Sequence, residues 1–306
     1  MNTFLPYEIR ELRPDETAAL FVVHAAIEPV HAGQLLAWTQ EMEERLETGG
    51  RAWVVARGRR LAGYALVDPV PGLPGVYDLS GGIVPARRRQ GLGARLLSHV
   101  QKSAGEIGIA QLSCRVESLE DAVAEFLLRR DFYVEHEECL LISNDLSALP
   151  LISDETLGEL RTYPTSEAIA LFCRVYNASF SGTPWAQPYL EAEVAATLAQ
   201  PEDLLFAVVD GAPVGVIWHE LIADGRGRVE PLGIIRSQQG RGYGRRLLLA
   251  ALHNLRQRDA QIVEIGVWRS NQVAMGLYRS LGFVESDTWY FLACDVGLPA
   301  AAVKAE

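Results

Sequence analysis

One glycine-rich stretch has the residue types and spacing of a phosphate-binding loop. Residues 239–244 read Gln-Gly-Arg-Gly-Tyr-Gly, after an apolar segment that ends at Ile235 and before leucines at helical spacing. Glycine lets the backbone turn sharply without a Cβ in the way, so successive amides can point at one anion. The following helix would direct its positive end at the same place. The stretch therefore predicts an anion site, with a purely structural turn as the alternative.

The same pattern occurs a second time nearer the N-terminus. Residues 83–97 align with residues 234–248 without a gap, and Gly91 lies 151 positions before Gly242. The ungapped alignment continues to residue 132. Such long-range self-similarity indicates a repeated structural unit, and 306 residues is the length of about two typical domains.

The elements expected around the two loops occur in the same order. In the first half we expect strands over 7–13, 52–57, 61–68, 76–84 and 111–116, helical segments over 14–47 and 120–130, and a closing strand pair over 132–143. In the second half we expect helical segments between 166 and 200, strands over 205–209, 213–221, 229–235 and 261–268, a helix over 271–281 and a closing strand from residue 283. A helix follows each glycine loop.

This order predicts the α+β class (mixed α/β). We expect two tandem domains, over residues 1–146 and 154–306, each a mixed, mostly antiparallel sheet flanked by helices. Residues 144–154, which include Pro150, are the expected linker.

Composition excludes several classes of protein. The 28 Lys and Arg against 39 Asp and Glu give a net charge of −11, which argues against non-specific binding to nucleic acid or an anionic membrane. A phosphate ligand would rely on the local clusters Arg87–Arg89 and Arg241 with Arg245–Arg246. The four cysteines lack C-x-x-C spacing and partnering histidines, so we expect free thiols and no metal site. With neither a signal peptide nor a membrane-length apolar run, we expect a soluble cytoplasmic protein.

The two loops and a later motif resemble the GNAT acetyltransferase superfamily over nearly the whole chain. In that family a strand followed by Arg/Gln-x-x-Gly-x-Gly/Ala binds the pyrophosphate of acetyl-coenzyme A, and residues 88–93 and 239–244 both match. A second family motif appears as Asn271, Ala274, Tyr278 and Gly282-Phe283. The resemblance implies acetyl-CoA as the acetyl donor and no metal.

The resemblance also implies which residues contact the coenzyme. In the second half they are Ile234, Ile235, Arg236, Gln239, Gly240, Arg241, Gly242, Tyr243, Gly244, Arg245 and Asn271. In the first half they are Ile83, Val84, Arg88, Arg89, Gln90, Gly91, Leu92 and Gly93. Asn271 has the N-cap of the following helix as an alternative role.

Glu230 and Tyr278 are the residues expected to move protons. An amine of pKa about 10.4 is only about 0.04% neutral at pH 7, so a base is needed. Glu230 lies on the strand before the loop, where related enzymes often carry a glutamate; it would act through water, with a raised pKa, or by stabilising positive charge. The resemblance makes Tyr278 the general acid for the departing thiolate. The alternatives are an ion-paired or solvent-facing carboxylate and a core tyrosine.

The first half lacks both of these residues. The offset of 151 puts Leu79 at Glu230 and Leu127 at Tyr278. We therefore expect the N-terminal domain to be catalytically degenerate, with a loop that either binds acetyl-CoA or serves structurally. Asp78 or Tyr133 would be the substitutes if catalysis used another geometry. The layout is similar to that of mycothiol synthases, which are tandem members of this superfamily.

The resemblance places the acceptor near the first helices and a hairpin of the second half. The residues there are Phe180, Trp185, Tyr189, Trp218 and His219. The aromatic residues have core packing as an alternative, and His219 is either a second base or a surface hydrogen-bonding residue.

We expect an acetyl-CoA-dependent N-acetyltransferase whose partner is a small-molecule or peptide amine. Nucleic acid and membranes are not expected partners, and the chain would act as a monomer or homodimer. An aminoglycoside or polyamine acceptor is the nearest rival. A non-catalytic acyl-CoA sensor or interaction module is the alternative from another class.

Overall fold

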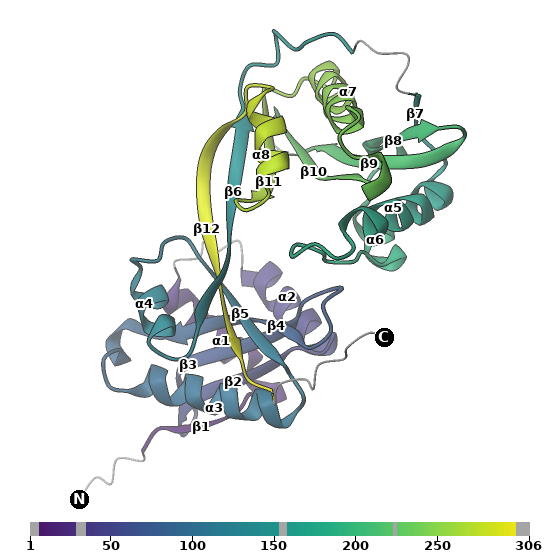
Figure 1. The fold of residues 1–306 in the computed structure, drawn as a ribbon. Coiled ribbons are helices and arrows are strands. Elements are labelled where there is room, and N and C mark those ends of the chain that lie inside the picture. The colour runs from purple at the N-terminus through teal and green to yellow at the C-terminus, as the bar shows by residue number, and fades with distance from the viewer. Residues whose placement is uncertain (1–5, 29–34, 153–157, 223–224, 298–306) are drawn as a thin grey trace, which may run out of the picture. The chain divides into compact units, whose positions relative to one another are not determined.

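The computed structural model describes residues 6–28, 35–152, 158–222 and 225–297 (Figure 1). The chain forms two compact units. The N-terminal unit comprises residues 1–116, 120–135 and 291–306, and the C-terminal unit comprises residues 117–119 and 136–290. The expected division between residues 146 and 154 differs from this one. The strands over residues 133–143 and 284–295 each contribute residues to both units.

The N-terminal unit is built on five consecutive strands of a sheet, with helices before and after its glycine loop. Its strands are β1 (Glu8–Glu11), β2 (Arg51–Arg57), β3 (Arg60–Pro69), β4 (Val76–Ile83) and β5 (Gln111–Val116), in that spatial order. Neighbours are antiparallel except β4 and β5. The helices are α1 (Thr17–Ile27), α2 (Leu35–Glu47), α3 (Leu92–Glu106) and α4 (Ala122–Leu128). Alternate residues of β2, namely Ala52, Val54 and Ala56, pack against Leu20 and Met42 of the first two helices.

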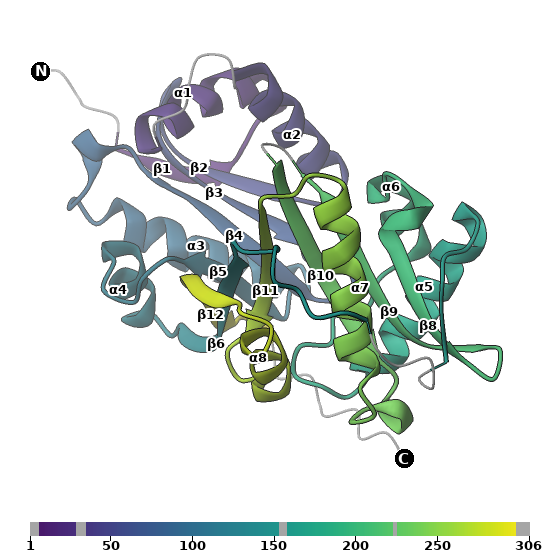
Figure 2. The same ribbon diagram turned by 90° about the horizontal axis from the view of Figure 1, so that it is seen from above.

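The C-terminal unit repeats this plan. Its strands are β7 (Glu159–Arg161), β8 (Leu204–Val209), β9 (Ala212–Leu221), β10 (Arg226–Ile234) and β11 (Ile262–Trp268), and its helices are α5 (Thr165–Phe180), α6 (Glu191–Thr197), α7 (Tyr243–Gln257) and α8 (Gln272–Arg279). Figure 2 shows α5 and α7 on either side of β8, β9 and β10. Two cores result, one around Leu248 and Ile265 under α7, the other around Phe172 and Phe206 under α5.

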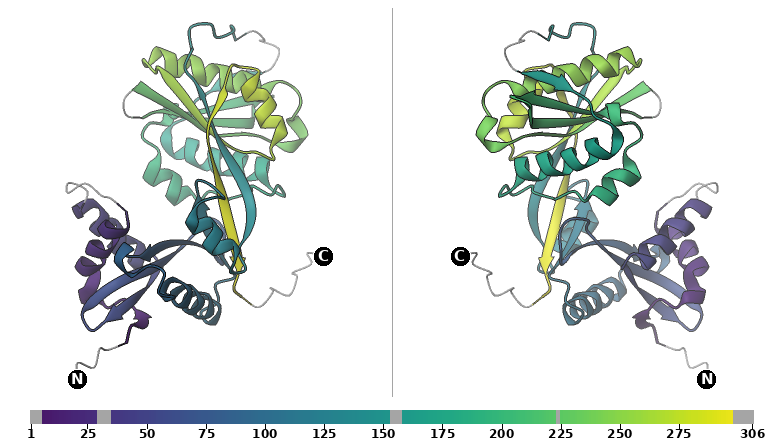
Figure 3. Two further views of the ribbon diagram at one scale, coloured as in Figure 1. Left: turned by 90° about the vertical axis from the view of Figure 1, so that its left-hand side faces the viewer. Right: turned by 90° about the vertical axis from the view of Figure 1, so that its right-hand side faces the viewer.

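The closing strands are exchanged between the two halves of the chain. β6 (Tyr133–Ser143) leaves the N-terminal half and pairs antiparallel with β11, from Glu138 opposite Trp268 to Ser143 opposite Val263. β12 (Val284–Asp295) leaves the C-terminal half and lies beside β5. Figure 3 shows β6 and β12 running next to each other. The strand pair expected over 132–143 is therefore wrong, because this segment is one long strand.

The hairpins form where the turn residues predict them. Gly58 has φ of +61°, and Asp210 and Gly211 have φ of +49° and +78°. Two consecutive positive φ values are those of a type I′ turn, whose twist matches that of the flanking strands. The predicted mixed, mostly antiparallel sheets with flanking helices are thus confirmed.

Candidate active site

The glycine loop of the C-terminal unit joins the end of β10 to the start of α7. After a 3-10 turn over Arg236–Gln238, Gly240 and Gly242 take φ of +74° and +91°. The side chain of Gln239 donates from Nε2 to the carbonyl oxygen of Ile234 at 2.9 Å, which ties the loop to its strand. The first backbone bond of α7 runs from Arg246 N to Gly242 O at 3.0 Å. The first-turn amides before it have no acceptor inside the helix, so they are available to an anion.

The side chains around this loop divide into those that face solvent and those with structural bonds. Arg236 and Arg241 are exposed. Arg245 donates to the hydroxyl of Ser280 at the end of α8, at 2.8 Å. Arg246 donates to the carbonyl of Gly158 at 2.7 Å. Tyr243 is buried in the core under α7, so only its amide can serve the loop.

β10 and β11 run together only at their starts. Parallel pairing joins Arg226–Arg228 to Ile262–Glu264, after which β10 follows β9 and β11 follows β6. The pairing of β10 with β9 shifts by one residue between Val229 and Leu232, which is a β-bulge at Glu230-Pro231. Proline lacks an amide hydrogen for the ladder and belongs at bulges or edges. The bulge re-aims Glu230, and in the described part of the sheet the end of β10 has no partner on its β11 side.

Glu230 is reached by solvent and yet surrounded by protein. The residue is exposed, whereas burial by nearby atoms is the main cause that raises the pKa of its carboxyl to about 7. The charge of Glu138 raises this pKa further, and Arg228 opposes the rise. This combination describes a carboxylate that water can reach from one side. With a pKa near neutrality it matches the requirement for a general base.

Tyr278 lies on α8, on the other side of the sheet. It is 6% exposed, and burial followed by the charge of Glu230 raises the pKa of its phenol above the usual range. The charge of Glu230 therefore acts on the phenol of Tyr278, across the gap where β10 and β11 separate. Asn271 begins the same helix, where its Oδ1 accepts from the amide of Ala274 at 3.2 Å. Its N-cap role is therefore present.

Aromatic side chains from α5 and the following loop cover the face on which Glu230 lies. Tyr176 and Tyr189 contact each other with centroids 4.8 Å apart, and Tyr176 lies 4.5 Å from Phe180. Burial is the main cause that raises the phenol pKa of both tyrosines, to about 12 for Tyr189, and the charge of Glu230 contributes to the rise in both. Trp185 lies edge-on to Trp268 at the end of β11, at 6.1 Å. Tyr189 and Phe180 thus pack with Tyr176, and Trp185 lies at the end of β11.

His219 and Trp218 do not join this group. Trp218 is 7% exposed and packs edge-on against Phe172, at 5.5 Å, in the core under α5. His219 points to the opposite face, as successive residues of a strand do. It is 1% exposed, and its Nε2 lies 3.3 Å from the amide of Asn254 on α7. Neither the second base nor the surface role expected of His219 fits this position.

Burial lowers the pKa of His219 to about 4, which predicts a pH-dependent stability. The unfolded chain binds this proton below about pH 6.5 and the folded chain does not, so stability is complete above 6.5 and is lost as the pH falls toward 4. From pH 6.5 to 5 the loss is roughly 2 kcal/mol. Unfolding of the His219→Gln variant at pH 7.5 and 5 should lack this loss. Equal losses in wild type, His219→Gln and the control His253→Gln would contradict the prediction.

Glu138, which the sequence did not single out, lies beside Glu230. A Cβ built on Gly266 of β11 would lie 3.1 Å from Oε1 of Glu138 and 3.0 Å from Oε2 of Glu230. The absence of a side chain at Gly266 therefore lets the two carboxylates converge. Glu138 belongs to β6, in the half of the chain assigned to the other domain. Only the glycine at 266 was a signal, and glycine in a strand indicates close approach by other groups.

The glycine loop of the N-terminal unit has the same backbone shape. Gly91 has φ of +76°, and Arg89, at the position of Gly240, has φ of +59°. Arg88 donates from Nε to the carbonyl oxygen of Ile83 at 2.9 Å, as Gln239 does to Ile234. The first backbone bond of α3 again runs to the N-cap, from Arg95 N to Gly91 O at 3.1 Å. Both loops therefore present a helix N-terminus in one geometry.

The strand before this loop differs. β4 pairs with β3 without a shift from Ile83 to Tyr77, so it has no counterpart of the bulge. Asp78 pairs with Ser113 of β5 as Arg228 pairs with Glu264. The equivalence of Leu79 with Glu230 is therefore wrong: Leu79 corresponds to Val229, because β10 has one residue more. Glu230 lies in that insertion.

The suggested substitutes lie elsewhere in the N-terminal unit. Asp78 lies on the paired part of β4, opposite Asp68, and burial followed by the charge of Asp68 raises its pKa. The hydroxyl of Tyr133 accepts from Gln111 at 3.0 Å and lies 3.5 Å from Asp295. Neither residue stands where the bulge places Glu230.

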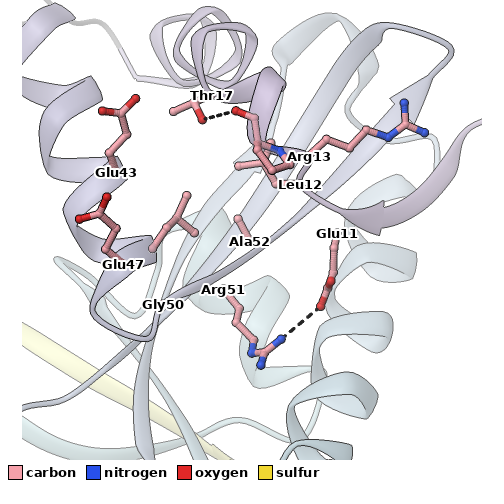
Figure 4. A pocket seen from close by; sticks show the side chains of 11 residues that line it. Glu11, Leu12, Arg13, Thr17, Glu43, Glu47, Gly50, Arg51 and Ala52 are labelled. Carbon is pink, nitrogen blue, oxygen red and sulfur yellow. Dashed lines mark hydrogen bonds and ion pairs between the residues drawn. The ribbon is translucent and has the colours of Figure 1, made fainter.

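A cavity of about 410 Å³ opens in the N-terminal unit between β1, β2, α1 and α2 (Figure 4). Glu43 and Glu47 line one side, and Arg13 and an Arg51–Glu11 ion pair at 3.5 Å line the other. It shares no residue with either glycine loop. In the described ranges no three His, Cys, Asp or Glu residues gather as metal ligands. No helix in those ranges has the length and apolarity to span a membrane.

The fold and the two loops define the class of the protein. The family model for the Acetyltransferase (GNAT) family matches residues 10–132 and 169–283. The chain therefore belongs to the GNAT acetyltransferase family, in a tandem arrangement.

Two relatives with similar sequences are mycothiol acetyltransferases. A mycothiol acetyltransferase of Thermomonospora curvata is 32% identical over 74% of this chain and 76% of its own length. A mycothiol acetyltransferase of Thermobispora bispora is 28% identical over 91% of this chain and 95% of its own. Among solved structures, a tandem GNAT protein from the clavulanic acid biosynthesis pathway superposes with a TM-score of 0.64 at 19% identity, over 95% of this chain and 99% of that one, which supports the fold.

Proposed function

We propose that the C-terminal unit transfers an acetyl group from acetyl-CoA to the amine of a small molecule or peptide, with Glu230 as general base and Tyr278 as general acid. The observation that carries the proposal is the carboxyl of Glu230 at the bulge of β10, beside Gly266 of β11, where burial raises its pKa to about 7. This bulge lies four residues before the strand end that opens the glycine loop. Base, anion site and phenol thus border the same divergence between β10 and β11.

The residues around the glycine loop of the C-terminal unit suit acetyl-CoA, the acetyl donor. Amides at the start of α7, with the exposed Arg236 and Arg241, would bind its pyrophosphate. The end of β10, free on its β11 side within the described sheet, offers backbone groups to an extended arm. Acetyl-CoA supplies a thioester as the activated acyl group. The side-chain Nδ2 of Asn271 would also contact the coenzyme, while its Oδ1 caps α8.

Two protons must leave an ammonium group before it becomes an amide. Glu230 takes the first, directly or through a water molecule, which makes the amine nucleophilic. Tyr278 gives its phenol proton to the departing sulfur. The new amide nitrogen then releases the second proton, which restores the phenol of Tyr278. Burial that raises the phenol pKa would raise the pKa of a buried thiol as well, so the proton transfer between them stays close to balanced.

The coupling between Glu230 and Tyr278 sets an order for these transfers. An ionised Glu230 opposes ionisation of the phenol. Once Glu230 has taken the proton of the acceptor, that opposition ends and Tyr278 becomes a better acid. Activation of the amine therefore precedes and assists protonation of the leaving group.

We further propose that the N-terminal unit binds acetyl-CoA without turning it over. Its loop has the backbone geometry of the other copy, and Arg87 and Arg89 are exposed beside it. It lacks the bulge, the carboxylate and the tyrosine. An acyl-CoA sensor would likewise bind without catalysis. In this proposal the sensor alternative applies to the N-terminal unit, and the C-terminal unit is the enzyme.

Matched valine substitutions separate the two loops. Valine is strained at the positive φ of Gly242 and Gly91 and disturbs the amides of the loop. We expect Gly242→Val to weaken acetyl-CoA binding about tenfold or more at one site and to abolish most turnover. Gly91→Val should reduce the calorimetric stoichiometry from two to one and leave turnover intact. A single site in the wild-type chain would contradict the proposal for the N-terminal unit.

The acceptor requires a direct screen. The name of the relatives points to an aminothiol of the mycothiol type, and the carboxylates at the site favour cationic amines, including polyamines and aminoglycosides. Release of free thiol from acetyl-CoA should be followed with each of these classes and with peptide N-termini. Turnover with at least one class is expected. Tight binding of acetyl-CoA without turnover on any of them would favour the sensor over the enzyme.

A further inference from the structure

Glu138 reaches the candidate site from the exchanged strand. Within β6 it lies opposite Trp268, two residues from Leu140, which lies opposite Gly266. Alternate residues of a strand share a face, so Glu138 projects on the face that Gly266 leaves open. Its Oε1 and Oε2 of Glu230 lie 3.1 and 3.0 Å from the same point. The two oxygens are therefore at most about 6.1 Å apart, by adding the two distances.

The carboxylate of Glu138 is held in place. Trp289 of β12 donates from Nε1 to Oε2 of Glu138 at 2.8 Å, which directs Oε1 toward Glu230. Trp268, the cross-strand neighbour of Glu138, is stacked on His136 at 3.7 Å and touches Trp185 edge-on. The indole rings of Trp268 and Trp289 thus lie beside Glu138.

Among the residues that the structure describes, no ion pair joins Glu230 or Glu138 to a basic side chain. Arg228, the nearest positive group on β10, is bound to Glu264 at 2.8 Å and lies 4.0 Å from Glu220. The other titratable groups that interact with Glu230 are Glu264, which is bound to Arg228, and the phenols of Tyr278, Tyr176 and Tyr189, which are neutral when protonated.

We infer that Glu138 binds the ammonium group of the acceptor beside Glu230, so that the site selects a cationic primary amine. This inference rests on the proposed function of the C-terminal unit. The ammonium group enters between the two carboxylates and gives one proton to Glu230. Glu138 keeps a hydrogen bond to the amine. The acceptor site of the C-terminal unit is then completed by a residue from the N-terminal half of the chain.

The variant Glu138→Gln tests this role. It keeps an acceptor for Trp289 and removes the charge. We expect the KM of a cationic amine to rise about tenfold or more, with a smaller change in kcat. Because Glu138 raises the pKa of Glu230, the acid limb of kcat/KM should also move to lower pH. An unchanged KM together with an unchanged acid limb would overturn the inference.

A matched control lies next to it. Glu137 points to the other face of β6 and is paired with Arg269 at 2.5 Å, so Glu137→Gln should alter neither readout. Gly266→Ala should reproduce the KM effect, because its Cβ would crowd both carboxylates. Unchanged acetyl-CoA affinity in each variant shows that the chain is folded.

Calorimetry without acetyl-CoA separates failure of this inference from failure of the proposed function. Benzylamine is a suitable probe, with uncharged benzyl alcohol as its counterpart. We expect benzylamine to bind the wild-type chain and Glu137→Gln equally, and Glu138→Gln about tenfold more weakly. This result would support the ammonium site even if no amine were acetylated. Equal affinity of all three chains for benzylamine, or equal affinity of the wild type for both probes, would overturn it.

Discussion

Replacing Glu230 with glutamine is expected to lower kcat/KM for the acceptor amine by about 10²- to 10⁴-fold, the range typical of a general base. The affinity for acetyl-CoA should change little, because the anion site lies on the loop and α7. The control is Glu220→Gln on neighbouring β9, which removes an equal charge from the rim of the Arg228 network. Turnover of Glu230→Gln at the wild-type rate would exclude this residue as the base.

The pH dependence gives the same substitution a second readout. The base works ionised, so wild-type kcat/KM should fall as the pH drops below about 7, the pKa of Glu230, and the variant should lack this limb. Stability should respond in the opposite sense. A carboxyl whose pKa is raised by folding favours the folded chain at low pH and loses that contribution as the pH rises through 7. Glu230→Gln should therefore have the higher Tm at pH 8.

Replacing Tyr278 with phenylalanine is expected to lower kcat by about 10²-fold or more while leaving the dissociation constant of acetyl-CoA nearly unchanged. The phenol is buried and its pKa is raised, so the hydroxyl is protonated throughout the working range. The loss should accordingly be similar from pH 6 to pH 9. Single-turnover thiol release, with calorimetry for binding, measures both quantities.

Tyr163→Phe is the control for this experiment. Tyr163 packs edge-on against Phe206 at 5.2 Å, in the core under α5, and losing its hydroxyl should not affect turnover. Because Tyr278 also packs near Phe283, at 6.2 Å, phenylalanine preserves the packing and removes only the proton donor. A rate equal to wild type in Tyr278→Phe would leave it a core tyrosine.

The local features of both loops were predictable from sequence. A left-handed backbone at Gly242 and Gly91 follows from the residue type, and the helices behind them follow from leucine spacing. The hairpin turn at Asp210-Gly211 is equally local. The GNAT fold and the tandem arrangement were also predictable, because the motifs recur at a fixed offset between the same elements.

The bulge escaped this reasoning for a physical reason. An ungapped offset assumes equal strand lengths, and it held for the loops and helices that follow Ile83 and Ile234. A bulge adds one residue to a strand without breaking the hydrophobic pattern on either side of it. Only the pairing of β10 with its neighbours β9 and β11 showed that Glu230 is an inserted residue and that Leu79 corresponds to Val229. His219 was misjudged similarly, since the face on which a strand residue lies depends on register.

By itself the sequence determined the two glycine loops, the repeated order of elements and the presence of a carboxylate and a tyrosine at family positions. These are short-range properties of backbone freedom and side-chain spacing. Tertiary structure alone decided that β6 and β12 are exchanged, that Gly266 opens room for two carboxylates, and that Glu138 meets Glu230. Strand pairing joins segments more than a hundred residues apart, and no local pattern in β6 states which sheet will accept it. The charge of Glu138, which adds to the larger effect of burial in raising the pKa of Glu230, likewise depends on that pairing.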